Sequence, residues 1–495
     1  MYIVMLASEC APVAKVGGLG DVVYGLSREL EIRGHAVEII LPKYDCMRYD
    51  HIWDLQISHS DLWVPWFNYH IRCTVWFGFI HGRKCFFIEP HSHDNFFSRG
   101  SYYGFVDEHM RFAFFTKAAL EFLLHAGKRP EIIHTHDWQT ALAPVMLYDL
   151  YQQAGMGCSR VCHTIHNFKH QGIAGENVLW FTGLGRPDYY FSRDRLGDDF
   201  NPSAINYSKG AVVYANYTTT VSPRHAWEVR HTDWGYGLGH TLHLHREKFG
   251  GVLNGLDYEM WNPQNDPYIA VPYDVEQFAA KAKNKAALRE RMWLRKEQKR
   301  EVARPLVAYV GRLDAQKGVP LIKHAIRYTL ERGGQFVLLG SSPEMGINAE
   351  FWELKHELNE HPDCHLEIGY NEELAHIIYA GADLLVVPSL FEPCGLTQMI
   401  ALRYGAVPVV RAVGGLADTV FDYHHSERPT QQRNGFVFHQ TDCHAVESAL
   451  RRALDLWYEE PEAFQELAMS GMRYDYSWNI PGEKYLEIYE LIRHK

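Results

Sequence analysis

The 495-residue sequence lacks the excess of basic side chains that nucleic-acid-binding proteins and proteins of anionic membrane surfaces normally carry. Acidic residues outnumber basic ones by 60 to 49, which gives a formal net charge of −11. Neither a nucleic acid nor a membrane is therefore an expected partner. The apolar run that begins at Met1 has no basic segment before it and is too short to span a bilayer. We expect a cytoplasmic protein.

The nine cysteines follow no repeated spacing, unlike those of a disulfide framework or a zinc motif. Cys158 and Cys162 precede His163, but no second pair of ligands completes a tetrahedral site. The sequence predicts reduced thiols, no metal and no cofactor. Two phosphate-binding signatures are also missing, because the glycine spacing fits neither the Rossmann dinucleotide fingerprint nor the Walker loop.

Short β-branched runs alternate with longer amphipathic stretches over most of the chain. The first half predicts strands at 2–6, 36–41, 131–134, 161–164 and 218–221, with a helix at 21–33. The second half predicts strands at 306–310, 336–339, 384–387 and 407–410, with helices at 320–332 and 396–404. This alternation is typical of parallel βαβ units.

The alternation breaks between 251 and 304, where a loop rich in Asn and Pro precedes a charged helix predicted at 277–300. Single cores usually stop growing at roughly 250–300 residues, so we place a domain boundary there. Residues 1–250 would form an N-terminal Rossmann-like domain and residues 251–477 a C-terminal one. The predicted class is α/β, with the two domains facing each other across a deep cleft that closes on its ligand. Ligands of such sheets bind beyond the carboxyl ends of the strands.

A glycine-rich segment, Lys15-Val-Gly-Gly-Leu-Gly-Asp21, lies between the first predicted strand and the first predicted helix. Glycines let a phosphate approach the backbone, and the start of a helix offers unpaired N–H groups. Lys15 would add a positive charge. A tight turn with an incidental lysine is the alternative interpretation.

Two clusters of polar residues also follow predicted strands, His134-Thr-His-Asp-Trp-Gln-Thr140 and His163-Thr-Ile-His-Asn167. Histidine and aspartate at such positions can bind a metal, hold a sugar hydroxyl or act as acid and base. A single buried histidine is more often a packing residue, but two clusters in equivalent positions weaken that interpretation. Trp138 could stack on a sugar ring.

In the second half, Gly311-Arg-Leu-Asp-Ala-Gln-Lys-Gly318 directly follows a predicted strand. It brings two positive charges, Arg312 and Lys317, to the end of that strand. A departing nucleoside diphosphate needs cations of this kind.

The segment Glu392-Pro-Cys-Gly-Leu-Thr397 is the most specific of the motifs. Glu392 lies in a turn between a strand and a helix, and the residues from Gly395 would aim N–H groups at a phosphate. We assign Cys394 a packing or positioning role, because no neighbouring His or Asn suggests an activated nucleophile.

Together these motifs, with Gly414-Gly-Leu-Ala-Asp-Thr-Val420, resemble those of bacterial glycogen synthase and plant starch synthase. The similarity extends from about residue 2 to the Ser477–Tyr485 stretch. It implies the GT-B fold and metal-independent, retaining transfer of glucose from ADP-glucose to the non-reducing 4-hydroxyl of an α-1,4-glucan such as glycogen or starch. It also implies an acceptor side in residues 1–250, completed by a helix over 478–495, and a nucleotide-sugar donor side in residues 251–477.

The resemblance implies roles for individual residues. Asp137 and His166 would surround the donor glucose, Glu392 would face the reacting sugar, and Tyr370 would cover the adenine. The implied catalytic residues are Glu392, His166, Lys15, Asp137, Arg312 and Lys317, and the implied substrate-binding residues are Gly17, Gly18, Asp21, Trp138, Asn254, Tyr370, Cys394, Gly395, Leu396 and Thr397. In the C-terminal helix, Tyr485, Ile488, Tyr489 and Leu491 recur at helical spacing and would pack on the N-terminal domain.

Two segments depart from the family pattern. Lys169 and His170 stand where apolar or aromatic residues are more usual, and Ser341-Ser-Pro343 replaces a second glycine and an acidic residue. Ile400 stands where many related transferases have a glutamate that grips the ribose, which favours the synthase branch over sucrose-type relatives.

The sequence offers no obvious second carboxylate to act with Glu392. A retaining hydrolase would need one about 5–5.5 Å away, so we favour a front-face displacement guided by the leaving phosphate. The alternatives are another GT-B transferase, such as a phosphorylase or a UDP-glucose-dependent synthase, and a catalytically silent glucan-binding or priming scaffold.

Overall fold

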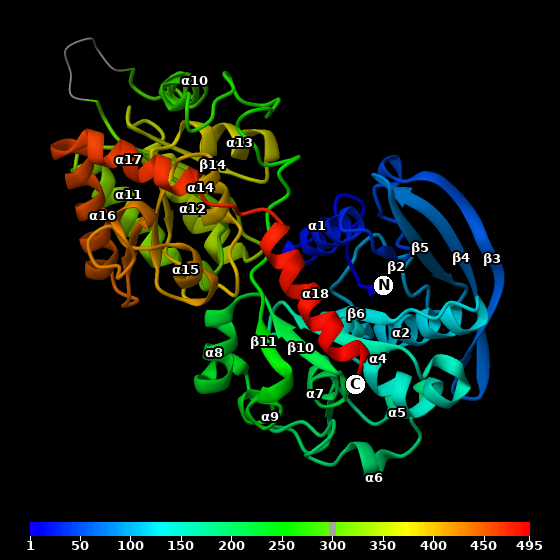
Figure 1. The fold of residues 1–495 in the computed structure, drawn as a ribbon. Coiled ribbons are helices and arrows are strands. Elements are labelled where there is room, and N and C mark those ends of the chain that lie inside the picture. The colour runs from blue at the N-terminus through cyan, green and yellow to red at the C-terminus, as the bar shows by residue number, and fades with distance from the viewer. Residues whose placement is uncertain (297–302) are drawn as a thin grey trace. The chain divides into compact units, whose positions relative to one another are not determined.

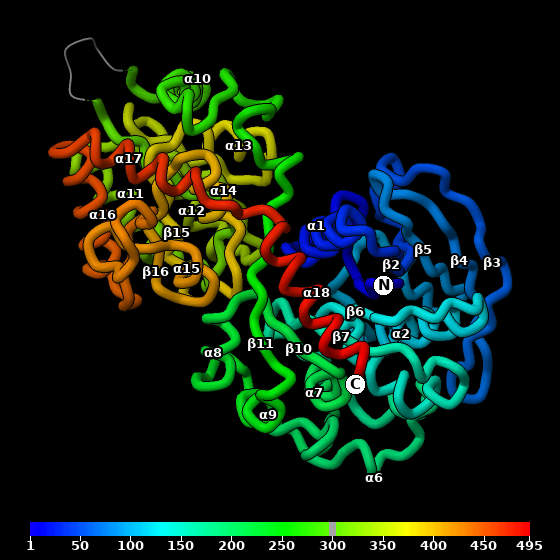
Figure 2. The backbone as a smooth tube through the Cα atoms, in the orientation of Figure 1, coloured from blue at the N-terminus to red at the C-terminus, as the bar shows by residue number. Residues whose placement is uncertain are grey.

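The computed structural model describes residues 1–296 and 303–495, which form two compact units. Unit 1 comprises Met1–Gly255 and Trp478–Lys495, and unit 2 comprises Leu256–Ser477. Each unit is built on a largely or wholly parallel sheet with helices against it, so the predicted α/β class is confirmed (Figure 1). The course of the backbone through both units can be followed in Figure 2.

The sheet of unit 1 has nine strands in the order β11-β10-β7-β6-β1-β2-β5-β4-β3. Strands β11 to β5 of this order pair in parallel, with β1 near the centre. The predicted strands of the first half are all found, with ends shifted by at most two residues. The bounds are β1 Tyr2–Leu6, β2 Ala36–Pro42, β3 Trp53–Trp66, β4 Tyr69–Ile80, β5 Arg83–Pro90, β6 Ile132–His136, β7 Arg160–Ile165, β10 Tyr217–Thr220 and β11 Phe249–Gly251, with β8 Ile173–Ala174 and β9 Ile205–Asn206 in a separate ribbon.

Strands β3, β4 and β5 form an antiparallel extension that the sequence analysis did not predict. β3 is mostly exposed along its first nine residues, so its polar and apolar residues do not alternate as those of a half-buried strand do. Its pairing with β4 also contains register shifts. The period-2 pattern that predicts such strands is therefore weak here.

The helices of unit 1 cover its sheet, and α2 is buried continuously from Arg111 to Leu123. α1 begins three residues before the predicted start, at Gly18. The bounds are α1 Gly18–Ile32, α2 Glu108–His125, α3 Asp137–Thr140, α4 Ala143–Met146, η2 Leu147–Met156, α5 Asn177–Thr182, α6 Pro187–Tyr190, α7 Tyr207–Tyr214, α8 Pro223–His231, α9 Gly239–Leu244 and α18 Asn479–Arg493, with short turns η1 Tyr49–His51, η3 Asp233–Gly235 and η4 Arg246–Lys248.

The C-terminal helix α18 belongs to unit 1, where it packs on α1 and β7 (Figure 1). Tyr485 and Tyr489 are fully buried, as their spacing predicts, but Leu491 is exposed and Ile492 is buried in its place. The spacing 485, 489, 492 keeps one face of a 3.6-residue helix, whereas 491 turns away from it. The approach to α1 is so close that a Cβ at Gly25 would lie 1.9 Å from Trp478 Nε1.

Unit 2 has a six-stranded parallel sheet in the order β14-β13-β12-β15-β16-β17. Its strands are β12 Leu306–Arg312, β13 Gln335–Ser341, β14 Cys364–Ile368, β15 Leu384–Val387, β16 Val407–Arg411 and β17 Phe436–Phe438. Its helices and turns are η5 Phe278–Ala280, α10 Lys281–Arg291, η6 Ala315–Lys317, α11 Val319–Glu331, α12 Met345–Leu358, α13 Glu372–Gly381, α14 Thr397–Arg403, α15 Gly414–Thr419, η7 Thr430–Gln432, α16 Cys443–Glu459 and α17 Pro461–Met472. The charged helix predicted at 277–300 is found as η5 and α10, and part of that range, 297–300, lies outside the described residues.

Candidate active site

The glycine-rich loop of unit 1 joins β1 to α1. Lys15 Nζ lies 2.8 Å from Asp21 Oδ1, and both side chains are partly exposed. A Cβ built at Gly17 or Gly18 would meet no atom within 4 Å. These glycines therefore leave open space beside the backbone, which is what the approach of a ligand requires.

Glu9, which the sequence analysis did not single out, holds this loop from within. Its Oε2 accepts hydrogen bonds from the backbone N–H groups of Val16 (2.7 Å) and Gly17 (3.0 Å). Its Oε1 accepts one from Tyr103 Oη at 2.7 Å. Burial raises the pKa of Glu9. Two of the loop's N–H groups are thus already occupied, and the only signal for this in the sequence is a carboxylate three residues after β1.

Asp137 and His166, predicted to act together, are brought together by the ends of the adjacent strands β6 and β7. Asp137 Oδ1 accepts hydrogen bonds from the backbone N–H groups of His166 (2.7 Å) and Asn167 (3.4 Å). The backbone of Asp137 has a positive φ of 55°, a conformation that non-glycine residues rarely adopt and that is frequent at functional sites. Burial raises the pKa of Asp137 to about 7.

The imidazole of His166 is electrically neutral near neutral pH, because burial lowers its pKa to about 3. Its Nε2 lies 3.1 Å from Nδ1 of His136. A neutral imidazole can donate one hydrogen bond and accept another, which suits a sugar hydroxyl.

Trp138 and Asn254 lie in the same unit. The Trp138 ring packs against the rings of Phe112 and Tyr207, so part of its surface is used in the core. Asn254 follows β11 and is buried, and its Oδ1 has no hydrogen-bond partner within residues 1–296 and 303–495.

In unit 2, Lys317 and Glu392 form a direct ion pair. Lys317 Nζ lies 2.5 Å from Glu392 Oε2, which also accepts a hydrogen bond from Ser389 Oγ at 2.9 Å. The two residues stand on loops after the neighbouring strands β12 and β15. The second predicted cation, Arg312, ends β12 with a largely exposed side chain, 3.6 Å from Asp314 Oδ2.

The loop that carries Glu392 rests directly on the start of α15. Gly415 N donates to Glu392 O at 3.1 Å. A Cβ at Gly414 would lie 1.9 Å from Glu392 O, and one at Gly415 would lie 2.0 Å from Cys394 O. Cys394 is buried in this contact. The pair of glycines in the downstream motif therefore lets two backbone segments touch and fixes the backbone of Glu392.

The remaining predicted residues of unit 2 lie near strand ends. Gly395 has a positive φ of 76°, Leu396 is the N-cap residue of α14, and Thr397 is its first residue. Tyr370 follows β14, is 79% exposed, and donates through Oη to Glu372 Oε2 at 3.0 Å. Its exposed ring is able to cover a nucleotide base.

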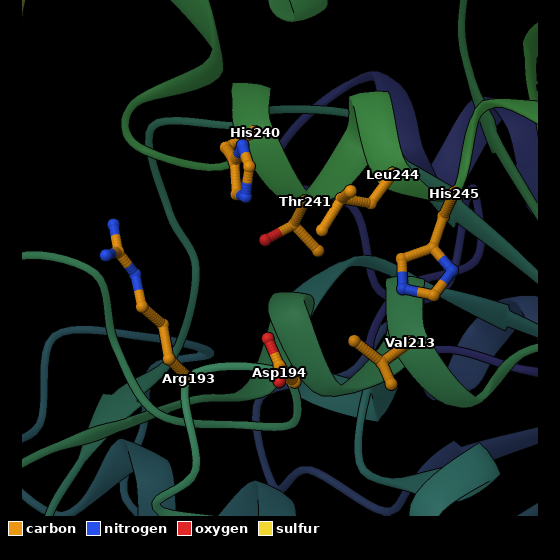
Figure 3. Close-up of a pocket in the computed structure, with 7 residues that line it drawn as sticks. All are labelled: Arg193, Asp194, Val213, His240, Thr241, Leu244 and His245. Carbon is orange, nitrogen blue, oxygen red and sulfur yellow. The ribbon is translucent and has the colours of Figure 1, made fainter.

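A pocket of about 570 Å³ lies elsewhere in unit 1 (Figure 3). His240 and Thr241 of α9 line it from one side, and Arg193 and Asp194 line it from the other. None of its lining residues belongs to the predicted site. Within the described parts of the chain, no group of three or more His, Cys, Asp or Glu residues is arranged to hold a metal, and no helix is long and apolar enough to cross a membrane.

Family models cover both units. The starch synthase catalytic domain matches residues 2–244, and the glycosyl transferases group 1 domain matches residues 291–469. Glycogen synthase 1 of Trichormus variabilis is 63% identical over all of both chains. Glycogen synthase 2 of Methylococcus capsulatus is 62% identical over 98% of this chain and 99% of its own.

Solved structures agree with this result. The catalytic domain of starch synthase IV from Arabidopsis thaliana, bound to ADP and acarbose, superposes with a TM-score of 0.95 at 44% identity, covering 100% of this chain and 99% of that one. Sucrose-phosphate synthase from Thermosynechococcus elongatus has a TM-score of 0.61 at 19% identity, which shows a shared fold. The predicted GT-B fold and the family resemblance are confirmed: this chain belongs to the glycogen synthase and starch synthase family of glycosyltransferases.

Proposed function

We propose that the protein transfers glucose from ADP-glucose to the 4-hydroxyl at the non-reducing end of an α-1,4-glucan, with retention of the anomeric configuration. The observation that carries this proposal is the full-length similarity to a starch synthase whose structure holds ADP and acarbose. ADP is the product that transfer from ADP-glucose would release. The proposal includes a cytoplasmic location and a reaction that needs no metal and no cofactor.

The cations of unit 2 stabilise the leaving group in this mechanism. Cleavage of the glycosidic bond places negative charge on the diphosphate of ADP, and positive side chains fixed in advance lower the energy of that state. Lys317 is already held in place by Glu392, and the exposed guanidinium of Arg312 is able to meet a phosphate with two parallel hydrogen bonds.

Glu392 acts by charge rather than as a nucleophile. Its Oε2 already accepts from Lys317 and Ser389, which stabilises the carboxylate and weakens it as an attacking group. Its negative charge then favours the positive character that the glucose ring gains at the transition state. The acceptor hydroxyl attacks from the face that the phosphate leaves. A covalent glucosyl adduct on Glu392, found by mass spectrometry during turnover, would overturn this step.

The residues of unit 1 hold the sugar. One nitrogen of the neutral His166 ring contacts His136, the other remains for a sugar hydroxyl, and Asp137 fixes the backbone of His166. Lys15 contributes a charge near the phosphates, beside a stretch of backbone that glycines leave open.

The test is nucleotide release with glycogen as acceptor and either ADP-glucose or UDP-glucose as donor. We expect ADP release and chain extension, with much slower reaction of UDP-glucose. A preference for UDP-glucose would support the other GT-B transferases considered above. Binding of glycogen without nucleotide release from either donor would support a non-catalytic glucan-binding or priming protein.

A further inference from the structure

Four histidines gather at the carboxyl ends of β6 and β7, and the mechanism above uses one of them. His134, His136 and His163 are fully buried, whereas His166 is half-buried. The rings of His134 and His136 pack closely in a tilted arrangement, with centroids 4.2 Å apart and planes inclined by 31°. The arrangement gives His166 a neighbour, His136, that touches it through a ring nitrogen.

The contact between His136 and His166 joins two neutral rings. Burial lowers the pKa of His136 well below its usual value, and the neighbouring histidines lower it further. Burial likewise lowers the pKa of His166 to about 3. A hydrogen bond between neutral imidazoles requires one nitrogen to carry the shared proton and the other to accept it. At 3.1 Å, His136 Nδ1 and His166 Nε2 are at hydrogen-bonding distance.

The other nitrogen of His136 decides which ring donates. His136 Nε2 is buried and has no hydrogen-bond partner within the described residues. If His166 donated, Nε2 of His136 would carry a buried N–H with no acceptor. If His136 donates through Nδ1, its Nε2 is an unused acceptor instead. Orphaned buried N–H groups are rarer in proteins than under-used acceptors, so the second arrangement is favoured.

The C-terminal helix α18 contacts His134, which packs against His136. Tyr489 Oη of α18 lies 2.7 Å from His134 Nδ1, and His134 Nε2 lies 2.7 Å from Thr164 Oγ1. Both nitrogens of His134 are therefore held by hydroxyl groups, which fixes the plane of its ring. Because the His134 ring lies against the His136 ring, the orientation of His136 depends on these bonds.

We propose that His136 is a positioning residue for His166. Its Nδ1–H donates to His166 Nε2, which confines the proton of the His166 ring to Nδ1 and makes Nδ1–H the donor that His166 offers to a sugar hydroxyl. Tyr489 of α18 stabilises the arrangement through His134. The role of His166 toward the sugar rests on the proposed function, but its tautomer does not.

The first experiment measures that tautomer without substrate. In protein labelled with ¹⁵N-histidine, long-range proton–nitrogen correlations distinguish rings protonated at Nδ1 from rings protonated at Nε2. The His166 signals are identified by their loss in His166→Asn. We expect wild-type His166 to be protonated at Nδ1. Protonation at Nε2 would overturn the proposal whatever the substrate is.

The second experiment compares two substitutions of His136 by steady-state kinetics with the nucleotide sugar that the wild-type protein uses. His136→Phe keeps a ring against His134 but removes the hydrogen bond, whereas His136→Asn keeps an N–H near the position of Nδ1. We expect kcat to fall about 10-fold to 100-fold in His136→Phe, the range seen when the outer partner of a metal-bound histidine is removed. His136→Asn should recover most of that loss, although both variants lose comparable thermal stability. Equal kcat values in the two variants would contradict a positioning role.

The third experiment tests the helix. Tyr489→Phe removes the hydroxyl near His134 but keeps the buried ring, and it should lower kcat by a few-fold. Tyr151→Phe is the matched control, because Tyr151 is also buried in unit 1 and donates to Glu121 Oε1 at 2.7 Å, away from the histidines. Tyr151→Phe should keep the wild-type kcat. The same kcat in both variants would remove α18 from the proposal.

Discussion

The two units differ in the charge state of the polar side chains at their candidate sites. In unit 1, burial removes charge from His166 and raises the pKa of Asp137 to about 7, so these two residues form a largely neutral hydrogen-bonded cluster. In unit 2, Glu392 is buried but stays beside a cation, Lys317. Neutral donors and acceptors suit the hydroxyl groups of a sugar, whereas fixed charges suit a diphosphate. In the proposed function, His166 and Asp137 of unit 1 would hold the sugar, and the cations of unit 2 would meet the leaving group.

The largest effect on turnover is expected from removing the cation of the Lys317–Glu392 ion pair in unit 2. Lys317→Ala removes the cation and leaves Glu392 buried without it, so kcat should fall by about 10²–10³-fold. Affinity for glycogen, measured by affinity electrophoresis, should stay near the wild-type value. Lys323→Ala is the control, because Lys323 pairs with Glu350 on α11 and α12 of the same unit. Near-normal turnover of Lys317→Ala would contradict the leaving-group role.

A smaller effect is expected from a substitution that forces α18 away from α1 within unit 1. Gly25→Ala would place a Cβ 1.9 Å from the Trp478 ring, so α1 and α18 must separate. Overpacking of this kind usually costs about 1–3 kcal/mol, which thermal unfolding would detect. A Cβ at Gly175 meets no atom within 4 Å, so Gly175→Ala is the matched control. Equal melting temperatures for the two variants would show that the contact with Trp478 is unimportant.

The pH dependence of stability tests whether Asp137 is desolvated. Its pKa is raised from 3.8 to about 7 in the folded chain, so between these values the folded state binds more protons than the unfolded state. The stabilising contribution of Asp137 is therefore complete below pH 4 and is lost as the pH rises through about 7. In denaturant titrations from pH 4 to 8, wild-type protein should lose stability relative to Asp137→Asn. A difference that does not change with pH would contradict the raised pKa.

Removal of divalent metals by chelation should have no effect on turnover. In the proposed mechanism, positive side chains supply the charge that a divalent metal would otherwise bring to the diphosphate. Turnover after EDTA treatment should equal that of untreated protein. Activity that is lost with EDTA and restored by magnesium or manganese would contradict this part of the mechanism.

Much of the fold could be predicted from local pattern. The runs 2–6 and 384–387 are found as strands with the predicted bounds, because continuous apolar, β-branched segments are typical of strands buried on both faces of a parallel sheet. The antiparallel β3 could not be predicted in the same way, since most of its first nine residues are exposed and its register is irregular.

The candidate site, like the fold, could be predicted only in part from local sequence. Lys317 and Glu392 could be predicted because each follows a strand and belongs to a recognisable motif, and the structure places them in contact. Glu9 and His136 act through three-dimensional contacts, with Tyr103 and His166 respectively, that sequence spacing does not reveal. Their identification depends on which buried atoms meet and on which of them lack a second partner.

The most direct test of the division between the units is the affinity for ADP, measured by isothermal titration calorimetry on wild-type protein, Lys317→Ala and His166→Asn. Lys317→Ala should bind ADP much more weakly than wild-type protein, because it loses a cation for the diphosphate. His166→Asn should keep the wild-type affinity, because ADP carries no glucose for His166 to hold. Wild-type affinity in Lys317→Ala, or a comparable loss in both variants, would contradict the assignment of the leaving group to unit 2 and of the sugar to unit 1.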